Sequence, residues 1–410
     1  MKVLFVAYQA ASDPLMESQG FSYMRRIAEK EAVQYSLLTF ETRESLVASK
    51  EYIAGLGNTI KWKYLMYRNR PRFPATCLNV ILGTLAVFSI ARKGKIDIVH
   101  ARGLIPALIA FIPAKLLNVK LFFDTRGLMA EKYVGGELLS KNGLLYKMMR
   151  WGENMLLEKC DFFTVETYRH AEIINKTSGH LSDKMDVIPC CVDMEKFDYV
   201  QSNNSSNLFK LVYLGKSETW YLISEMLDLF KVMCADMPNA LFVFLTQNDP
   251  DLFFEAARAK GINDSQISVT KPERGEISGL LEEADAGIFF INSYKRYNSS
   301  PVKFGEYLAC GLPVVVNSGI GDCDEIVINE RIGVVLHEFS KEGYKRALDE
   351  LKNLLSEGEV LRKRCRDAAA RYFSLEMGAG KYGNIYKRML VGPKNRIAAQ
   401  GRGLPAGDVR

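Results

Sequence analysis

The sequence predicts an α/β protein with two doubly wound, parallel-sheet domains that face each other across a cleft. Short apolar runs alternate with helical patterns over most of the 410 residues, which is typical of parallel strands joined by helices on both sheet faces. The polar stretch Asn203–Asn207 interrupts this alternation, and the pattern then starts again. A chain of this length also exceeds what one hydrophobic core accommodates, so more than one domain is expected.

In the first half, each apolar run is short enough for a strand and precedes a longer segment with helical spacing. The strands expected here are Lys2–Tyr8, Tyr35–Phe40, Ile60–Tyr67, Ile96–Ala101, Lys120–Asp124, Phe162–Glu166 and Met185–Pro189. The helices expected between them are Glu17–Lys30, Glu44–Ala54, Ala75–Lys93, Leu104–Leu117, Gly143–Lys159 and Arg169–Lys176. We therefore expect residues 1–200 to form a first Rossmann-like domain.

After the polar stretch, residues 201–373 are expected to form a second Rossmann-like domain. Its strands are expected at Lys210–Leu214, Leu241–Leu245, Ile267–Val269, Gly287–Ile291, Pro313–Val316 and Val334–Leu336, alternating with helices. Two helices, Val360–Tyr372 and Leu375–Leu390, close the pattern. We expect residues 374–392 to pack back on the first domain. The tail 393–410 has few apolar residues and is expected to be disordered.

The bulk properties exclude several functions. The chain is 48% hydrophobic and 25% charged, as in an ordinary soluble globular protein. Its formal net charge of +6 suits anionic ligands or an anionic membrane surface, and no zinc-finger or RNA-binding signature accompanies it. The eight cysteines include no CxxC pair, which favours buried thiols in a reducing cytosol over disulfides or a metal site.

Two stretches of the sequence indicate where in the cell the protein is expected. The N-terminal Met1–Val6 leads directly into a strand, so no signal peptide is expected. The longest apolar stretch, Cys77–Ala91, is shorter than the roughly 20 residues that span a bilayer, and it contains Asn79 and Gly83. We therefore expect a cytoplasmic protein, with the inner face of the membrane as a place where it could act.

The segment Ser299–Pro313 has the pattern of a phosphate-binding site. Ser300 is expected to cap a helix whose first residue is Pro301, where a missing N–H group costs nothing. Gly311 and Pro313 are expected to end that helix before the buried strand that follows.

The start of this helix should attract a diphosphate. Its first-turn N–H groups point at the site, and Lys303 adds a positive charge. Glu306, one turn further on, is spaced to accept hydrogen bonds from a ribose. The alternative is an ordinary capped helix with a surface Lys–Glu pair.

The order and spacing of several short motifs resemble the GT-B nucleotide-sugar glycosyltransferases, particularly the retaining family 4, whose members build cell-surface polysaccharides. The similarity extends over residues 1–390. The matching segments are Ile96–Ala107 ("DIVHxHG"), Phe123–Leu128, Val187–Asp193 with Phe197 ("IPNGVD…F"), Val212–Lys216 ("YVGR"), Ser299–Pro313 and Gly319–Val327 ("GGxxEIV").

This resemblance implies a donor site in the second domain. Glu306 matches the second glutamate of the family's E-x7-E pattern, and Asn298 stands where the first would be. Lys216 stands at the position of the family's diphosphate-binding arginine, and Lys303 is expected to be a second phosphate contact. The expected donor-binding residues are Asn298, Ser299, Ser300, Pro301, Val302 and Glu306. The expected catalytic residues are Arg126, Lys216 and Lys303.

The first domain departs further from the family pattern. Arg126 stands where many members have a histidine near the reacting carbon, and Arg102 replaces the second histidine of "HxH". A planar guanidinium suits a leaving phosphate or an anionic acceptor. For Arg126 the alternative is a salt bridge with Asp124 or Glu131, and His100 is expected to be a core residue.

The acceptor is expected on the side of the first domain, where a loop replaces the glycine pair that the family has after its first strand. The segment 128–140 is expected to be a loop that acts as a mobile flap on that side. The expected acceptor-side residues are Gln19, Gly20, Arg102 and Glu131.

No metal is expected in the site. Asp322-Cys323-Asp324 and Asp249-Pro250-Asp251 both spell D-x-D, the metal motif of the other major glycosyltransferase fold. Both precede expected helices, where an aspartate serves as a cap. No separate cofactor is expected either, because the nucleotide diphosphate sugar is itself the substrate.

A basic segment precedes the longest apolar stretch. No acidic residue occurs from Tyr52 to Ile96. Its cations are interleaved with aromatic residues, and the pattern predicts either a solvated face or a docking surface for anionic lipid or a lipid-linked acceptor. The cations are Lys61, Lys63, Arg68, Arg70 and Arg72, and the aromatic residues are Trp62, Tyr64, Tyr67 and Phe73.

These features predict a glycosyltransferase that moves a sugar from a nucleotide diphosphate donor to a saccharide acceptor, which we expect to be lipid-linked. The resemblance implies retention at the anomeric carbon, in capsule, O-antigen or exopolysaccharide synthesis. Two alternatives stay open: a nucleotide-sugar epimerase on the same fold, and a non-catalytic sugar-nucleotide-binding protein. A nicotinamide dehydrogenase is disfavoured because no G-x-G-x-x-G follows Lys2–Tyr8 or Lys210–Leu214.

Overall fold

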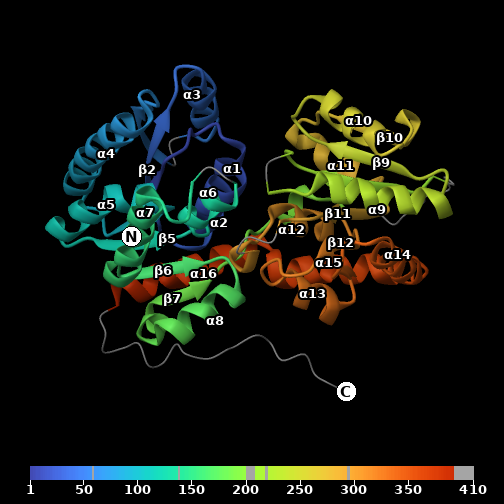
Figure 1. Cartoon of the computed structure of the whole chain (residues 1–410). Coiled ribbons are helices and arrows are strands. Elements are labelled where there is room, and N and C mark those ends of the chain that lie inside the picture. Colours follow the sequence, from blue (N-terminus) through green and yellow to red (C-terminus); the bar gives the residue numbers. More distant parts are fainter. Residues whose placement is uncertain (58–59, 137–138, 200–207, 218–219, 293–295, 392–410) are drawn as a thin grey trace.

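The computed structural model describes residues 1–57, 60–136, 139–199, 208–217, 220–292 and 296–391. Two lobes, each built on one sheet, make up the molecule (Figure 1). All strand pairs within both sheets are parallel. The predicted α/β fold of two doubly wound domains is therefore confirmed.

The first sheet has the strand order β3-β2-β1-β4-β5-β6-β7. Its strands are β1 (Lys2–Ala7), β2 (Gln34–Glu41), β3 (Ile60–Met66), β4 (Ile98–Arg102), β5 (Lys120–Asp124), β6 (Phe162–Val165) and β7 (Met185–Val187). The central strands are buried on both faces, as parallel strands covered by helices must be.

Helices cover both faces of this sheet. One face packs against α4 (Arg72–Gly94), α5 (Leu104–Leu117), α7 (Leu144–Lys159) and α8 (Tyr168–Thr177). The other face packs against α2 (Ser22–Lys30), α3 (Ser45–Gly55) and α16 (Leu375–Leu390), the last helix of the chain. Before α2 the chain forms α1 (Pro14–Met16) and a π-helical turn, Glu17–Phe21.

The second sheet has the order β10-β9-β8-β11-β12-β13. Its strands are β8 (Lys210–Leu214), β9 (Leu241–Leu245), β10 (Ile267–Thr270), β11 (Ala286–Phe289), β12 (Val314–Asn317) and β13 (Gly333–Leu336). Its helices are α9 (Ile223–Asp236), α10 (Pro250–Ala259), α11 (Ile277–Glu282), α12 (Val302–Ala309), α13 (Cys323–Glu330), α14 (Lys341–Leu355) and α15 (Glu359–Phe373). In both sheets the strand order reverses beside the first strand, where a crevice for ligands forms.

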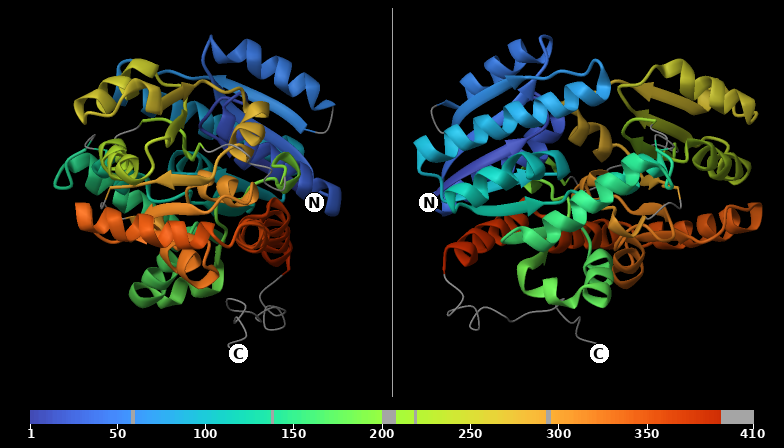
Figure 2. Two further views of the ribbon diagram at one scale, coloured as in Figure 1. Left: turned by 90° about the vertical axis from the view of Figure 1, so that its right-hand side faces the viewer. Right: turned by 60° about the vertical axis from the view of Figure 1, so that its left-hand side comes forward.

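The chain crosses between the lobes twice, and the two crossings are hydrogen-bonded to each other. The Val192 N–H donates to the Phe373 carbonyl at 2.7 Å, and the Leu375 N–H donates to the Val192 carbonyl at 2.8 Å. After this bridge, α16 returns to the first lobe and packs against α2 (Figure 2). The joint between the domains is thus a short β-bridge.

Two expectations about individual elements were wrong. Residues 128–140 are not a loop throughout, because α6 (Met129–Gly135) lies within them. The backbone N–H of Ala130 donates to the Glu153 carboxylate at 3.2 Å, which ties α6 to α7. Residues 137–138 of that segment lie outside the described residues.

The apolar stretch around Cys77–Ala91 is longer than expected. Pro74–Gly94 is long and apolar enough to cross a membrane by length and composition, which is a weak signal on its own. Val87 and Ile90 of this helix belong to the core beneath it, and a third of the apolar window is buried. In this structure α4 is therefore a helix of the folded first domain.

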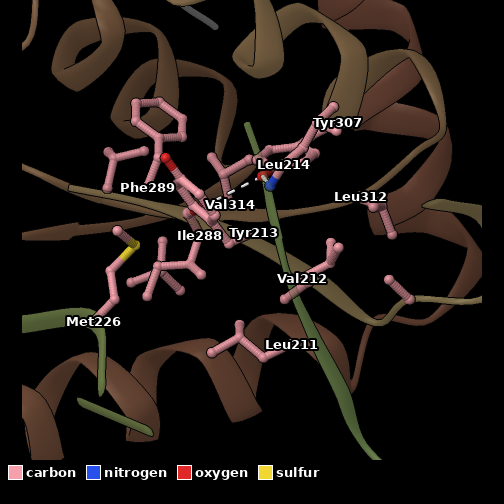
Figure 3. Close-up of a cluster of buried hydrophobic side chains, with 14 of the residues drawn as sticks. Leu211, Val212, Tyr213, Leu214, Met226, Ile288, Phe289, Tyr307, Leu312 and Val314 are labelled. Atoms are coloured by element: carbon pink, nitrogen blue, oxygen red, sulfur yellow. Dashed lines mark hydrogen bonds between the residues drawn. The ribbon is translucent and has the colours of Figure 1, made fainter. Parts of the chain in front are cut away.

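Helix α12 packs unusually close to its sheet. The Tyr307 ring crosses β11 at Gly287, where a Cβ atom would lie 2.5 Å from Cδ2 of Tyr307. The Tyr307 hydroxyl accepts a hydrogen bond of 2.7 Å from the Leu214 N–H on β8 (Figure 3). The absence of a side chain at position 287 thus fixes the height of α12 above the sheet.

We expect Gly287→Ala to lower the free energy of unfolding by about 2 kcal/mol, because the added methyl group overpacks the contact between β11 and Tyr307. Urea unfolding monitored by circular dichroism measures this difference. Gly279→Ala is the control, since nothing lies within 4 Å of a Cβ atom there, and it should unfold at or above the wild-type midpoint. Equal loss in both variants would contradict the packing argument.

Candidate active site

A cavity of about 590 Å³ lies between the lobes, where strand ends of both sheets face each other. From the first domain it is lined by Tyr8, Gln9, Arg102, Gly103, Thr125, Arg126, Gly127, Met129, Glu131, Tyr133, Glu166 and Cys190. From the second domain it is lined by Trp220, Tyr221, Ile291, Asn292, Asn298, Ser299, Ser300, Pro301 and Val302. The cavity therefore brings together predicted residues from both halves of the chain.

The N-terminus of α12 opens onto this cavity. The helix begins at Val302, with extended Pro301 as its N-cap, and no side chain caps it. The prediction that Ser300 caps a helix starting at Pro301 was wrong, because the Ser300 hydroxyl instead accepts a hydrogen bond of 3.1 Å from the Cys190 N–H. Because no described side chain caps the helix, its N-terminus can face an anion, although the Phe304 N–H already donates to the Pro301 carbonyl at 3.0 Å.

Both domains hold the segment that leads into α12. The Thr167 hydroxyl, in the first domain, donates to the Tyr297 carbonyl at 2.6 Å. From the other side, Gly321 has φ = +48°, and a Cβ atom there would lie 2.1 Å from the Ser299 carbonyl oxygen. Only glycine fits this contact.

Arg126 lies at the turn after β5, with a left-handed backbone (φ = +49°). Its Nε lies 3.3 Å from Oε1 of Glu166, and its Nη2 donates to the Gln19 amide oxygen at 3.1 Å. Arg126 thus forms an ion pair with Glu166, which the sequence did not suggest, while Asp124, one of the two expected partners, lies close enough for its pKa to respond to the Arg126 charge. The reason is topological: Glu166 directly follows β6, which is paired with β5, so both side chains leave the sheet at the same edge.

Gln19 and Gly20 are buried and lie behind the cavity rather than in its described lining. The Gln19 amide donates to the Cys191 carbonyl at 2.8 Å, and its backbone carbonyl accepts from Arg102 at 3.1 Å. Gln19 therefore holds both arginines of the site in place. The assignment of Gln19 and Gly20 to the acceptor side stays a prediction.

A buried polar network lies beneath Arg102. Asp124 accepts hydrogen bonds from the Tyr382 hydroxyl and the Thr164 hydroxyl, both at 3.1 Å. Burial by itself would raise the pKa of Asp124, but the charge of Arg126 and the contact with His100 together hold it well below its usual range. The Asp124 carboxylate therefore stays ionised.

His100 is a core residue, as expected. Its Nδ1 lies 2.7 Å from the Tyr386 hydroxyl, and its Nε2 lies 3.6 Å from Asp124. Burial lowers the pKa of His100, although Asp124 opposes this effect. The C-terminal helix α16, which carries Tyr382 and Tyr386, thus completes the polar network of the first domain.

Glu131 lines the cavity from α6 and is buried. The Tyr146 hydroxyl donates to it at 2.9 Å, and Arg150 Nε lies 3.6 Å away. Both partners belong to α7, so α7 fixes the position of this carboxylate on the first-domain side of the cavity.

Neither of the two predicted lysines is among the described residues that line the cavity. Lys216 is exposed. Lys303 is buried, and its Nζ lies 4.0 Å and 3.7 Å from the ring centroids of Tyr213 and Tyr221. These contacts are favourable cation–π interactions. The expected ammonium beside the first turn of α12 is therefore found behind the Tyr221 ring.

The backbone at Gly215, just after β8, lies directly against the Lys303 ammonium group. Gly215 has φ = +131°, and a Cβ atom there would lie 2.8 Å from the Lys303 Nζ. Lys303 and Lys216 thus meet the same turn after β8, one beneath it and one on its outer side.

Asn298 precedes α12, and Glu306 lies one turn into the helix. Asn298 is buried and lines the cavity. Burial raises the pKa of Glu306 to about 7, although the charges of Arg274 and Lys303 lower it in part. A bound hydroxyl group that donates a hydrogen bond would favour the ionised carboxylate.

Sequence reasoning missed Glu166 and Arg274. Arg274 lies beyond β10 and donates to the Pro14 carbonyl at 2.7 Å, which links the two lobes at the cleft. Both residues follow a strand closely, and a search for charged residues at strand ends would have found them.

The D-x-D segments act as hydrogen-bond acceptors. Asp322 accepts from the Tyr168 and Arg169 N–H groups at 2.7 Å and 3.0 Å, which caps α8 of the other domain. Asp249 accepts from the Asp251 N–H at the start of α10. Among the described residues, no group of three His, Cys, Asp or Glu side chains is placed to hold a metal ion.

Family comparisons agree with the two-domain architecture. A family model described as Glycosyltransferase Family 4 matches residues 28–196, and one described as Glycosyl transferases group 1 matches residues 195–372. The two matches follow each other without a gap, one on each domain. The chain therefore belongs to the GT-B glycosyltransferases. Comparison with curated protein sequences gives no match.

Solved structures share the whole fold at low sequence identity. Sucrose-phosphate synthase from Thermosynechococcus elongatus has a TM-score of 0.71 and 14% identity, covering 95% of this chain and 99% of that chain. Anabaena HepE in complex with UDP-glucose has a TM-score of 0.69 and 12% identity, covering 95% and 100%. WaaG, a glycosyltransferase involved in lipopolysaccharide biosynthesis, has a TM-score of 0.64 and 14% identity, covering 94% and 99%.

We expect Asp124→Asn to flatten the dependence of stability on pH. Because the pKa of Asp124 is lowered in the folded protein, its stabilisation is present above the unfolded value of about 4 and is lost as pH falls. The variant should lose about 2 kcal/mol of unfolding free energy at neutral pH, since Arg126 and Arg102 lose a buried counter-charge.

Urea titrations at neutral pH and at about pH 3.5 measure this effect against wild type. At the acidic pH, the difference in unfolding free energy between the variant and wild type should be smaller than at neutral pH. Asp349→Asn, at an exposed position of α14, is the control and should follow the wild-type profile. An equally large difference in unfolding free energy at both pH values would show that the Asp124 charge does not cause the loss of stability.

Proposed function

We propose that this protein transfers a sugar from a nucleoside diphosphate sugar to a saccharide acceptor in the cavity between its domains. The observation that carries the proposal is the N-terminus of α12, which no side chain caps and which opens onto the cavity at Ser299–Val302. A similar structure, that of HepE, is described in complex with UDP-glucose, which supports a nucleotide-sugar donor.

The donor would bind mainly to the second domain. Its diphosphate lies against Ser299–Val302, where the helix dipole and the first-turn N–H groups favour negative charge. Lys216 and Lys303 add positive charge at the turn after β8, and Lys303 reaches the phosphates when the Tyr221 ring moves aside. Glu306 accepts hydrogen bonds from the ribose. Asn298 contacts the transferred sugar without adding a charge.

The reaction proceeds with retention, by attack on the same face from which the diphosphate departs. The bond between the anomeric carbon and the phosphate oxygen breaks, and the acceptor oxygen bonds to that carbon. The acceptor proton moves to the departing phosphate oxygen. Charge on the diphosphate is offset by the helix N-terminus and the cations, with no metal ion required. Arg126 and Arg102 face the cavity from the first domain and orient the leaving group or an anionic acceptor.

The acceptor enters beside Glu131, and we propose that it is a lipid-linked saccharide in cell-surface polysaccharide synthesis. This assignment places the protein in the cytoplasm, at the inner face of the membrane. It rests on the resemblance to the polysaccharide-building family.

Thermal-shift screening against uridine, guanosine and thymidine diphosphates, followed by a transfer assay with the sugar form of the base that binds, tests the proposal. We expect one nucleotide to raise the melting temperature, and its sugar to be transferred with unchanged anomeric configuration by NMR. EDTA should leave the rate unchanged. Isomerisation of the donor alone, without acceptor, would instead assign an epimerase, and binding with no turnover would assign a binding protein.

We expect donor affinity to rise with pH through neutrality. The pKa of Glu306 is about 7, and a ribose that donates hydrogen bonds favours the ionised carboxylate, so Kd should fall about tenfold from one pH unit below to one above. Calorimetry with the nucleotide sugar measures this change. Glu306→Gln cannot ionise and should give a weaker, nearly flat profile. An equally steep profile in that variant would contradict the role of Glu306.

We expect Lys303→Met to lower kcat about a hundredfold, because one cation that stabilises the departing diphosphate is removed. The methionine keeps much of the lysine's apolar packing between Tyr213 and Tyr221. Steady-state kinetics measure the change, and urea unfolding checks that the variant is folded. Wild-type kcat in a folded variant would remove Lys303 from the mechanism.

A further inference from the structure

Helix α4 carries an apolar face that no described element covers. Leu78, Ile81 and Leu85 are three and four residues apart, so they lie on one side of the helix. All three are exposed, while Val87 and Ile90 of the same helix are buried in the core of the first domain. The helix therefore has an inner apolar face for the fold and an outer one for solvent.

The neighbouring helices repeat this arrangement. Ile112 and Leu116 are exposed on α5, four residues apart, and Leu144, Met148 and Trp151 are exposed on α7 with the same helical spacing. Helix α5 contacts both α4 and α7, and the three helices lie on one face of the sheet (Figure 2). These eight side chains, between 42% and 74% exposed, form what we name the α4–α5–α7 face.

The charges on and around this face are mainly positive. Neither α4 nor α5 contains an acidic residue, and α7 contains two: Glu153 is buried, whereas Glu158, in the last turn, is exposed and lies 2.9 Å from Nε2 of His180. Exposed Lys115 lies on the outer side of α5 and exposed Lys147 on that of α7. The other exposed cations near the face are Lys61, Lys63, Arg68, Arg70, Arg92 and Lys93.

The lysines of the edge strand β3 belong to the same side of the sheet. Lys61 and Lys63 alternate with Trp62 and share a face with Leu65. Leu65 packs against the core beneath α4 and α5, whereas Trp62 packs against the core on the opposite side. The basic segment predicted from the sequence therefore borders the α4–α5–α7 face. The side chains of Arg72 and Phe73 lie outside the described residues.

We infer that the α4–α5–α7 face docks on an anionic lipid bilayer. Exposed leucine, isoleucine and tryptophan side chains surrounded by cations match the interface of a bilayer that carries acidic headgroups. The charge argues against a second copy of this chain as the occupant, because two such faces would bring like charges together. Helix α4 stays packed on the domain, so the contact is peripheral.

The docked face is connected to the cavity through α7. The outer side of α7 exposes Met148 and Trp151, while Tyr146 and Arg150 of the same helix contact Glu131 in the cavity. Docking would therefore set the acceptor side of the cavity close to the headgroups. This last step rests on the proposed function, and the docking itself does not.

Sedimentation with vesicles tests the inference. We use pure phosphatidylcholine vesicles and two-to-one phosphatidylcholine–phosphatidylglycerol vesicles. Wild type should bind the anionic vesicles, less so at high salt, and should not bind the neutral ones. Ile81→Ser/Leu85→Ser/Trp151→Ser should weaken binding at least about tenfold. Lys61→Gln/Lys63→Gln/Arg68→Gln/Arg70→Gln should weaken it by a similar factor.

The matched control is Leu252→Ser/Ile328→Ser/Val360→Ser, which removes three exposed apolar side chains from the second domain and should bind as wild type does. Unbound wild type, or equal binding by the apolar variant and wild type, would overturn the inference. A wild-type dimer that the apolar variant makes monomeric would assign the face to a second copy instead.

Nucleotide binding and the unfolding midpoint, measured in the same variants, separate the two proposals. Intact nucleotide binding without vesicle binding overturns the docking inference alone. Vesicle binding without any nucleotide binding overturns the proposed function alone.

Discussion

The start of α12 is held by hydrogen bonds and close contacts from both domains, and the site depends on this constraint. Ser300 accepts from Cys190, the Tyr297 carbonyl accepts from Thr167, and Gly321 gives the Ser299 carbonyl the room that any side chain would fill. These contacts use the Ser300 hydroxyl away from the helix. No described side chain caps the helix, so its N-terminus can face a ligand, and the ligand position is fixed relative to the first domain as well.

The first domain depends in turn on the C-terminal helix. Tyr382 and Tyr386 come from α16, after the chain has crossed back, and they contact Asp124 and His100 beneath the cavity. Asp124 is in turn a counter-charge for Arg126. A helix that belongs to the end of the chain thus helps to set the charge balance at the ends of β4 and β5. The Val192–Leu375 bridge joins these two halves of the molecule.

Local sequence pattern was sufficient for the fold. The apolar runs and helical periods placed the strands of both sheets close to their observed bounds, because buried parallel strands and amphipathic helices have different periods. The family resemblance, together with the pattern of the phosphate site, selected Asn298, Ser299, Ser300, Arg126 and Glu131, all of which line one cavity.

What the sequence could not show depends on contacts between distant segments. The use of Ser300 by Cys190 requires the other domain, and so does the burial of Gln19 behind Arg126. Lys303 lies behind Tyr221 because Gly215 leaves space there, a contact that helix spacing does not reveal. The outer apolar face of α4 became visible only once its inner face was known. Periodicity finds an apolar helix, but tertiary packing decides which side is covered.

A crystal structure with the bound nucleoside diphosphate tests the central claim most directly. The account requires phosphate oxygens within hydrogen-bonding distance of the backbone N–H groups at the entrance to α12, with the ribose hydroxyls at the carboxylate one turn further on. A nucleotide bound elsewhere, with that helix end unoccupied, would contradict it.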